Sequence, residues 1–576
     1  FWLKLIKLWP CLGQDRHSHA PFFFPYPLCA PSGHRSMEDA EALLEKAAQK
    51  VLEIHAIGAS KAPANPTAAE LFDAFCARKE TSPEKVFVEN RFFTGFPHAQ
   101  VDWSRPVHGI LVDFKGDSMQ IGMLLQRLEA CGEQYVFIGN PPPFNGGWHF
   151  TALNDFEHVN EQRQLDPSWE GFRIWHQVNY VPSTTDEGEP ALVPRETFDP
   201  KSKTAGAIPI NSSFKLATIF LTGGLMPHTL NATILADGND AAAVIKKHFD
   251  LGVRFATIGH GLDVLLALGE GKSIISGFHA AVFPKQDHLL TINGVLPATD
   301  HAPVCSSSHA GVQLVSASFW GKRTCEPFFD AVGLASDRMD TSFPSSGRVQ
   351  RLGSSETAFC FDVSKLATLS GTRIDGHPGA PRVAVFVDHV ADPIEAYTIL
   401  DHLIKVNFTV HLISHSVDAG DPATINTVRT ETVWGNAMYA LKDCCCILPT
   451  VPANLLDPSL QFDGFFVAGG QCPYYMMQDP AITAIMDSAP FAAAVCHGPE
   501  ALIGSKWLHP ASGTVGPFIS YYGAWMSFRD ILSAYERKKP GEICEDTTGR
   551  LFTGNAPNST KAMVERACEA MAAAKS

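Results

Sequence analysis

The strongest constraint on the fold is a strand–helix–strand pattern that occurs once in each half of this 576-residue chain. In the first half, residues 109–138 run from an apolar strand pattern through an amphipathic helix to a second apolar run, and residues 382–413 repeat that order. Short apolar runs that alternate with helices are typical of right-handed βαβ units in a parallel sheet. The sequence therefore predicts two α/β domains.

The two halves also match beyond this first unit, which indicates an internal duplication. The segment 217–224 corresponds to 463–470, and 255–261 corresponds to 492–498. A third match preserves its spacing. In the first copy, Ser316 lies in a strand pattern and follows position 259 by 57 residues; in the second copy, Thr553 lies in a strand pattern and follows position 496 by the same distance. A preserved spacing is harder to obtain by chance than one short motif.

The boundaries follow from shifts in composition. We expect a leader at 1–36, a helical N-terminal extension at 37–104, a first domain at 105–336, a linker at 337–380 and a second domain at 381–576. The leader is basic and poor in acids, as targeting segments are, but it could equally be untranslated sequence ahead of a methionine start. The linker is rich in Ser, Gly and Thr and has little periodicity.

Charge and cysteine usage exclude several classes of protein. With 45 basic and 60 acidic residues, the chain lacks the basic clusters of a nucleic-acid binder, and it has no apolar run long enough for an integral membrane segment. The 14 cysteines form no CxxC pair and no metal-ligand spacing, which favours a reducing compartment. We expect the cytoplasm or an organelle interior, which would be a mitochondrion or plastid if residues 1–36 are a targeting segment.

The chemistry is concentrated at Cys496. Small residues (Ala492, Ala493, Ala494) form a strand that breaks at Cys496 and continues toward a helix, as in a nucleophile elbow. A thiol at a helix N-terminus is stabilised as thiolate, so Cys496 is predicted to be reactive.

On these motifs the second half resembles the DJ-1/PfpI superfamily, the class I glutamine-amidotransferase-like fold. The motifs that carry the resemblance are Glu395 in the segment DPIE, the AGG turn at 468–470, the AVCHGP elbow at 494–499, TVGP at 514–517 and LFTG at 551–554. The resemblance implies two tandem flavodoxin-like domains of α/β class, each a mostly parallel sheet with helices on both faces.

For the site, the resemblance implies Cys496 as nucleophile, His497 as general acid/base and Glu395 as a protonated carboxyl beside the thiol. Backbone N–H groups at Gly469, Gly470 and His497 would form the oxyanion hole. It implies no cofactor and no metal.

The first copy departs from this pattern at the reactive positions. Gly259 stands where the nucleophile should be and Gln120 where the carboxyl should be, although Gly223, Gly224 and His260 match. Without a thiol or a carboxyl, the first domain is expected to be a catalytically dead partner that packs on the second domain.

Three functions stay open. The first is a glyoxalase III-like or deglycase-like enzyme that converts reactive carbonyls such as methylglyoxal through a hemithioacetal on Cys496. The second is a PfpI-type cysteine hydrolase or peptidase. The third is a non-enzymatic redox-sensing or accessory scaffold with a role in oxidative stress, in a homo- or hetero-oligomer. The corresponding partners are a small carbonyl substrate or another protein.

Overall fold

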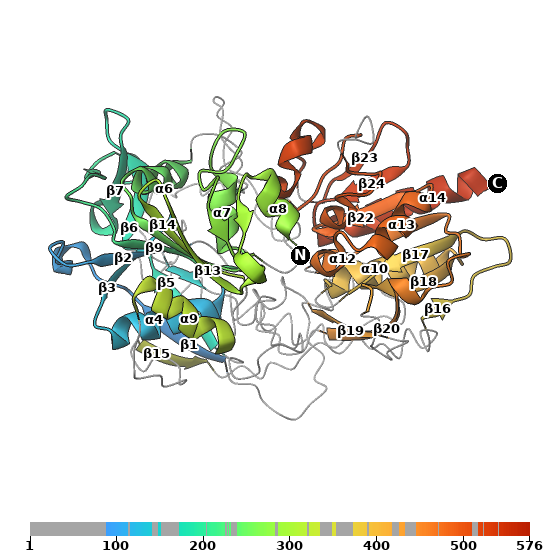
Figure 1. Ribbon diagram of the computed structural model, residues 1–576, viewed down its shortest axis with the longest axis horizontal. Coiled ribbons are helices and arrows are strands. Elements are labelled where there is room, and N and C mark those ends of the chain that lie inside the picture. Colours follow the sequence, from blue (N-terminus) through green and yellow to red (C-terminus); the bar gives the residue numbers. More distant parts are fainter. Residues whose placement is uncertain are drawn as a thin grey trace, which may run out of the picture.

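The computed structural model describes two α/β domains that lie side by side (Figure 1). It covers residues 88–575 except 113–115, 141–147, 151–171, 203, 225–226, 228–229, 232–238, 283–285, 319–321, 335–347, 353–371, 389–390, 418–425, 432–444, 471, 510–515, 522 and 540. The leader 1–36 and the helices expected before residue 88 lie outside these residues.

The sheet of the first domain has the order β13-β14-β10-β9-β2-β3-β6-β7-β8. The strands from β14 to β6 are parallel, and antiparallel strands close both edges. Their bounds are β2 (Val107–Leu111), β3 (Gln134–Ile138), β6 (Tyr180–Thr184), β7 (Pro190–Pro194), β8 (Ile208–Pro209), β9 (Thr218–Leu221), β10 (Arg254–Ile258), β13 (Val304–His309) and β14 (Val312–Ala317).

The second domain repeats this arrangement with the order β19-β20-β18-β17-β21-β22-β24-β23, and β16 pairs with β18. The strands from β20 to β24 are parallel. Their bounds are β16 (Arg373–Ile374), β17 (Arg382–Phe386), β18 (Thr409–Ser414), β19 (Asn426–Glu431), β20 (Cys445–Pro452), β21 (Gly464–Val467), β22 (Ala492–Val495), β23 (Ile543–Glu545) and β24 (Leu551–Gly554).

Helices cover both faces of each sheet, because parallel strands alternate their side chains between two buried faces. In β2, Ile110 packs into the core under α4 and α9, whereas Leu111 packs into the core under α6 and α7. The helices are α4 (Ser118–Ala130), α6 (Asp240–Asp250), α7 (Gly261–Ala267), α8 (Asp287–Ile292), α9 (Lys322–Val332), α10 (Pro393–Lys405), α12 (Cys472–Met476), α13 (Pro480–Ser488) and α14 (Thr560–Lys575). The fold class predicted from the sequence is confirmed.

The duplication is visible in strand register as well as in order. The residue two before position 259, Thr257, pairs with Ser316, and the residue two before Cys496, Ala494, pairs with Thr553. The spacing shared by the two halves of the sequence therefore corresponds to one register in two sheets.

Strands also occur in the parts of the sequence that were expected to be a helical extension and a linker, and in the first domain outside its main sheet. Four of them form a separate sheet in the order β15-β1-β5-β4. Its members are β1 (Val88–Phe93), β4 (Trp148–Phe150), β5 (Phe172–Gln177) and β15 (Arg348–Leu352). The described end of the extension 37–104 is thus a strand and a short 3-10 turn, η1 (His98–Gln100), and is not helical. A short strand contains too few residues to show a clear alternation of apolar and polar side chains. Hydrophobic periodicity therefore did not predict these strands.

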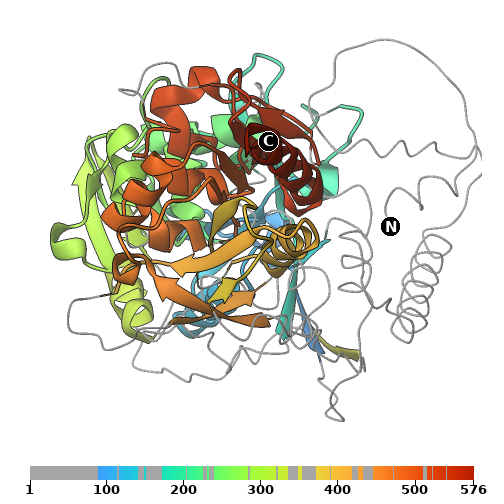
Figure 2. The same cartoon turned by 90° about the vertical axis from the view of Figure 1, so that its right-hand side faces the viewer.

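The domains meet through the segments that follow their two elbows. In the second domain this segment includes η10 (Trp525–Ala534), and its Trp525 and Met526 pack into the core of the first domain. The Trp525 indole N–H donates to the Asn231 carbonyl at 3.1 Å, and the Asn293 amide donates to the Met526 carbonyl at 3.1 Å. In Figure 2 the second domain, in yellow to red, lies in front of the green helices of the first domain. The interface therefore lies beside both elbows.

None of the helices in the described part of the chain has the length and hydropathy to span a bilayer.

Candidate active site

Cys496 occupies a strained turn at the end of β22. Its φ is +58°, a left-handed conformation that costs a non-glycine residue about 1–2 kcal/mol. Three hydrogen bonds clamp the turn, because Cys496 N–H donates to the Gly554 carbonyl at 2.8 Å, and the Cys496 carbonyl accepts from Tyr521 N–H and the Ser520 hydroxyl. The elbow predicted from the sequence is therefore present.

Glu395 lies in the first turn of α10 and is completely buried. Its Oε2 accepts the Gly469 N–H at 2.6 Å, whereas its buried Oε1 has no hydrogen-bond partner among the described residues. Burial, and then the nearby Asp392 carboxylate, raise the pKa of Glu395 well above its ordinary value. The raised pKa favours the neutral carboxyl, which is the state that the resemblance implies for Glu395.

The role assigned to Gly469 in the oxyanion hole is wrong, because Glu395 already occupies its N–H. Gly469 instead makes room for the site. A Cβ at this position would lie 2.6 Å from Cys496 Cβ and 2.6 Å from Glu395 Oε2. The N–H groups of Gly470 and His497 act on the Cys496 thiol by lowering its pKa, and their role as oxyanion donors stays a prediction.

We expect Gly469→Ala to lower the free energy of unfolding by about 2–3 kcal/mol, because the added methyl overlaps packed atoms that cannot move apart. Urea unfolding measures this difference. Gly504→Ala is the control, since its Cβ would meet open space and only its positive φ of +89° adds strain, about 1 kcal/mol. Equal losses in the two variants would contradict the packing argument.

The expectation of a thiolate held by a helix N-terminus is also wrong. The element after the elbow is a single 3-10 turn, η8 (Gly498–Leu502), whose dipole is small. Burial, then Glu395 and Asp392, raise the pKa of Cys496, and the N–H groups of His497 and Gly470 oppose this increase. Protonation of Glu395 removes one of these negative charges. Burial therefore favours the neutral thiol, which must lose its proton when it reacts.

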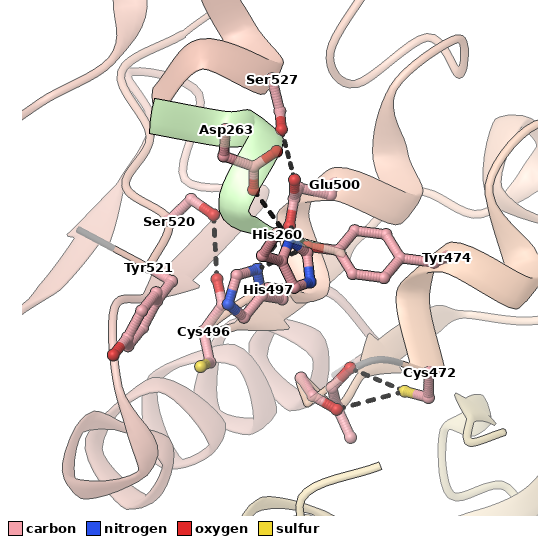
Figure 3. Close-up of polar contacts among 12 residues, drawn as sticks. His260, Asp263, Cys472, Tyr474, Cys496, His497, Glu500, Ser520, Tyr521 and Ser527 are labelled. Carbon is pink, nitrogen blue, oxygen red and sulfur yellow. Dashed lines mark hydrogen bonds and ion pairs between the residues drawn. The ribbon is translucent and has the colours of Figure 1, made fainter. Parts of the chain in front are cut away.

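His497 is held by a network that the sequence analysis did not assign. Its Nδ1 lies 2.6 Å from Oε2 of Glu500, so this nitrogen is engaged by the carboxyl group and Nε2 is not. Glu500 is also the acceptor for the Tyr474 hydroxyl at 3.0 Å and for the Ser527 hydroxyl. Figure 3 shows these side chains around His497 and around His260 of the first domain, at the domain interface. These contacts fix the orientation of the His497 ring.

Glu500 could have been found from the sequence. An acidic residue follows the elbow histidine by three positions in both copies, as Glu500 after His497 and as Asp263 after His260. Residues three apart on a helical turn face one another, so both copies predict a His–carboxylate pair. The partners Tyr474 and Ser527 come from other elements, and no sequence signal points to them.

The first copy keeps the frame of the site without its reactive groups. Gly259 has φ +53°, and Gln120 Oε1 accepts the Gly223 N–H at 2.6 Å, as Glu395 accepts from Gly469. His260 Nδ1 lies 2.8 Å from Asp263 Oδ2. Gly224 bridges to Gly116 as Gly470 bridges to Ala391. The first elbow is thus folded like the second but has no thiol.

The protonation of Glu395 gives a pH-dependent contribution to stability. A carboxyl with a raised folded pKa stabilises the fold fully below its unfolded value, near 4.5, and loses that contribution as pH rises through the folded pKa. We expect Glu395→Gln, which is neutral at every pH, to gain stability relative to wild type above pH 4.5, by up to about 1.4 kcal/mol per pH unit in that window. Urea unfolding of both proteins between pH 4.5 and 8 measures the difference, and a constant difference would contradict it.

Fold and site together define a class of protein, namely a parallel α/β protein whose cysteine lies on a strained turn after a central strand. Solved structures to which the chain is similar include DJ-1 and ThiJ/PfpI domain proteins. Oxidized DJ-1 of Toxoplasma gondii is 18% identical over 34% of this chain and 98% of its own, with a TM-score of 0.25.

Two further structures cover similar shares. DJ-1beta of Drosophila melanogaster is 18% identical over 34% of this chain and 91% of its own, with a TM-score of 0.25. A ThiJ/PfpI domain protein of Brachyspira murdochii is 11% identical over 34% of this chain and 99% of its own, with a TM-score of 0.26. No family model and no curated protein matches the chain.

Proposed function

We propose that the second domain is a cysteine-dependent enzyme of the DJ-1/PfpI type that converts small reactive carbonyls, with methylglyoxal as the first substrate to test. The observation that carries the proposal is that Cys496 and the buried Glu395 carboxyl lie next to one another, since a Cβ on Gly469 would be 2.6 Å from Cys496 Cβ and 2.6 Å from Glu395 Oε2. The N–H groups of Gly470 and His497 complete the set. This set supplies a nucleophile, a proton donor and an oxyanion site around one reacting carbon.

The chemistry begins with addition of the thiol to the aldehyde. The sulfur forms a bond to the aldehyde carbon, Glu395 gives its proton to the carbonyl oxygen, and the thiol proton replaces it on Glu395. The N–H groups of Gly470 and His497 stabilise the oxygen while it carries charge. The product is a hemithioacetal, and no net proton leaves the site.

His497 then moves a proton within the bound substrate. Its Nε2 removes the hydrogen on the former aldehyde carbon as a proton and returns it to the neighbouring carbon, while the hydroxyl proton of the hemithioacetal passes to the oxygen of that neighbouring carbon. The two transfers convert the hemithioacetal to a lactoyl thioester. Water hydrolyses the thioester and restores the thiol. One substrate carbon is oxidised and its neighbour is reduced, so methylglyoxal plus water gives lactate without an external oxidant or reductant.

The burial of Cys496 favours a small substrate over a peptide. Only 4% of its surface is exposed. An aldehyde of a few atoms fits such a site, whereas an extended peptide needs an open groove beside the nucleophile. A thiol that works in this way must stay reduced, so we propose the cytoplasm or an organelle interior as its compartment.

The test is production of lactate from methylglyoxal by the purified full chain without added thiol, alongside cleavage of fluorogenic peptides. Lactate formation without peptide cleavage is the expected result. Peptide cleavage alone would favour the hydrolase function. If neither occurs, but mild peroxide adds two oxygen atoms to Cys496 as detected by mass spectrometry, the redox-sensing alternative replaces the enzyme.

A further inference from the structure

The first domain contributes a buried histidine–carboxylate pair directly beside the second domain's site. His260 and Asp263, at the start of α7, are 2% and 3% exposed and lie 2.8 Å apart through Nδ1 and Oδ2. Burying a carboxylate is costly unless it has a partner. The pair has no nucleophile to serve in its own domain, because position 259 is glycine.

Tyr474 of α12 connects this pair to the second site. Its ring centroid lies 5.6 Å from that of His260 and 6.0 Å from that of His497. Its hydroxyl donates to Glu500 Oε2 at 3.0 Å and lies 3.2 Å from His497 Nδ1. In Figure 3, Tyr474 and the two histidines form one cluster, with Asp263 on the green α7 and Glu500 on the second domain.

The pKa of Tyr474 also depends on charged groups of both domains. Burial, then Glu500 and then Asp263 raise its pKa, and Cys496 adds to the effect. The titratable groups around it thus come from α7 and from the elbow of the second domain. Tyr474 stays a neutral donor to Glu500, and the ring of His260 limits where its own ring can lie.

We propose that His260 and Asp263 are positioning residues for the second-domain site, which act through Tyr474 on the His497–Glu500 pair. The first domain then completes a site in which it has no reacting atom. The proposal rests on the proposed function for the role of His497 as a base. It gives the degenerate copy a specific task, because the orientation of His497 depends on a hydrogen bond whose donor is held from the other domain.

The experiment compares Asp263→Asn and Tyr474→Phe with wild type by two readouts. The first is the pH dependence of Cys496 alkylation by iodoacetamide, followed by mass spectrometry, and the second is kcat and KM for methylglyoxal. We expect both variants to shift the alkylation profile by half a pH unit or more and to lower kcat about tenfold with little change in KM. Thermal unfolding identifies any variant that fails to fold, and Tyr474→Phe, which removes one hydroxyl, serves if Asp263→Asn does not fold.

Asp287→Asn is the matched control, since Asp287 pairs with His301 at 3.6 Å in the same domain but on the surface. It should leave both readouts unchanged. Folded Tyr474→Phe with a wild-type alkylation profile and a wild-type kcat would overturn the proposal. If wild type forms no lactate, the proposed function fails, while the alkylation profiles alone still decide whether the two domains are coupled at this site.

Discussion

Cys496→Ala is expected to reduce lactate formation from methylglyoxal to the uncatalysed background, a loss of about 10⁴-fold or more in kcat. The reason is that every later step takes place on the carbon bound to sulfur, and no neighbouring group can replace the thiol. The thiol of Cys472, also buried near this site, donates to the Ala468 and Gly469 carbonyls at 3.2 and 3.3 Å, which holds it in place beside them. Lactate measured against time with purified variants tests the expectation.

The fold should survive this change. The backbone of position 496 is fixed by bonds to Gly554, Ser520 and Tyr521, none of which uses the thiol. Unfolding in urea should therefore shift by no more than about 1 kcal/mol. Cys131→Ala, at a half-buried thiol of the first domain, is the control and should keep full activity. Activity retained by Cys496→Ala would remove this residue from the mechanism altogether.

Glu395→Gln is expected to lower kcat by about 10²–10³-fold while leaving the fold intact. The chain itself shows that glutamine fits this position, because Gln120 accepts the Gly223 N–H at 2.6 Å in the first copy. The variant therefore keeps the hydrogen bond to Gly469 and loses only the acidic proton. Steady-state kinetics at pH 7 measure the loss, and KM should change less than kcat because binding is preserved.

The reverse change in the first copy, Gln120→Glu, is the matched control. It should leave lactate formation at the wild-type level, since Gly259 offers no sulfur there. If Glu395→Gln turned over methylglyoxal as fast as wild type, the carboxyl would have only a structural role, and the proton for the carbonyl oxygen would have to come from elsewhere.

Much of the second-domain site could be read from its local sequence. The elbow at Cys496, the adjacent His497 and the carboxyl of Glu395 were all predicted, and the structure brings them together at the carboxyl ends of β17, β21 and β22. These residues are predictable because strand ends of a parallel sheet meet at one edge, whatever the intervening loops contain.

Two other features of the site, the hydrogen bond of Gly469 and the pKa of Cys496, depend on which groups surround these atoms in the folded chain. Gly469 matched the motif, but its N–H is used by Glu395, and this competition is decided by a 2.6 Å contact between two distant segments. The thiol pKa was predicted to fall and instead rises, because the helix is only one 3-10 turn and burial is complete. Local sequence does not report desolvation, since burial is a property of everything packed around a group.

The sequence by itself determined the two α/β domains, their common register and the residues of each elbow, because hydrophobic periodicity and spacing specify a parallel sheet locally. Only the tertiary structure decided that the two elbows face one interface, where Tyr474 lies between His260 of one copy and His497 of the other. The physical reason is that this contact depends on how two folded surfaces pack. Such packing is set by side chains that are hundreds of residues apart, such as Trp525 against Asn231.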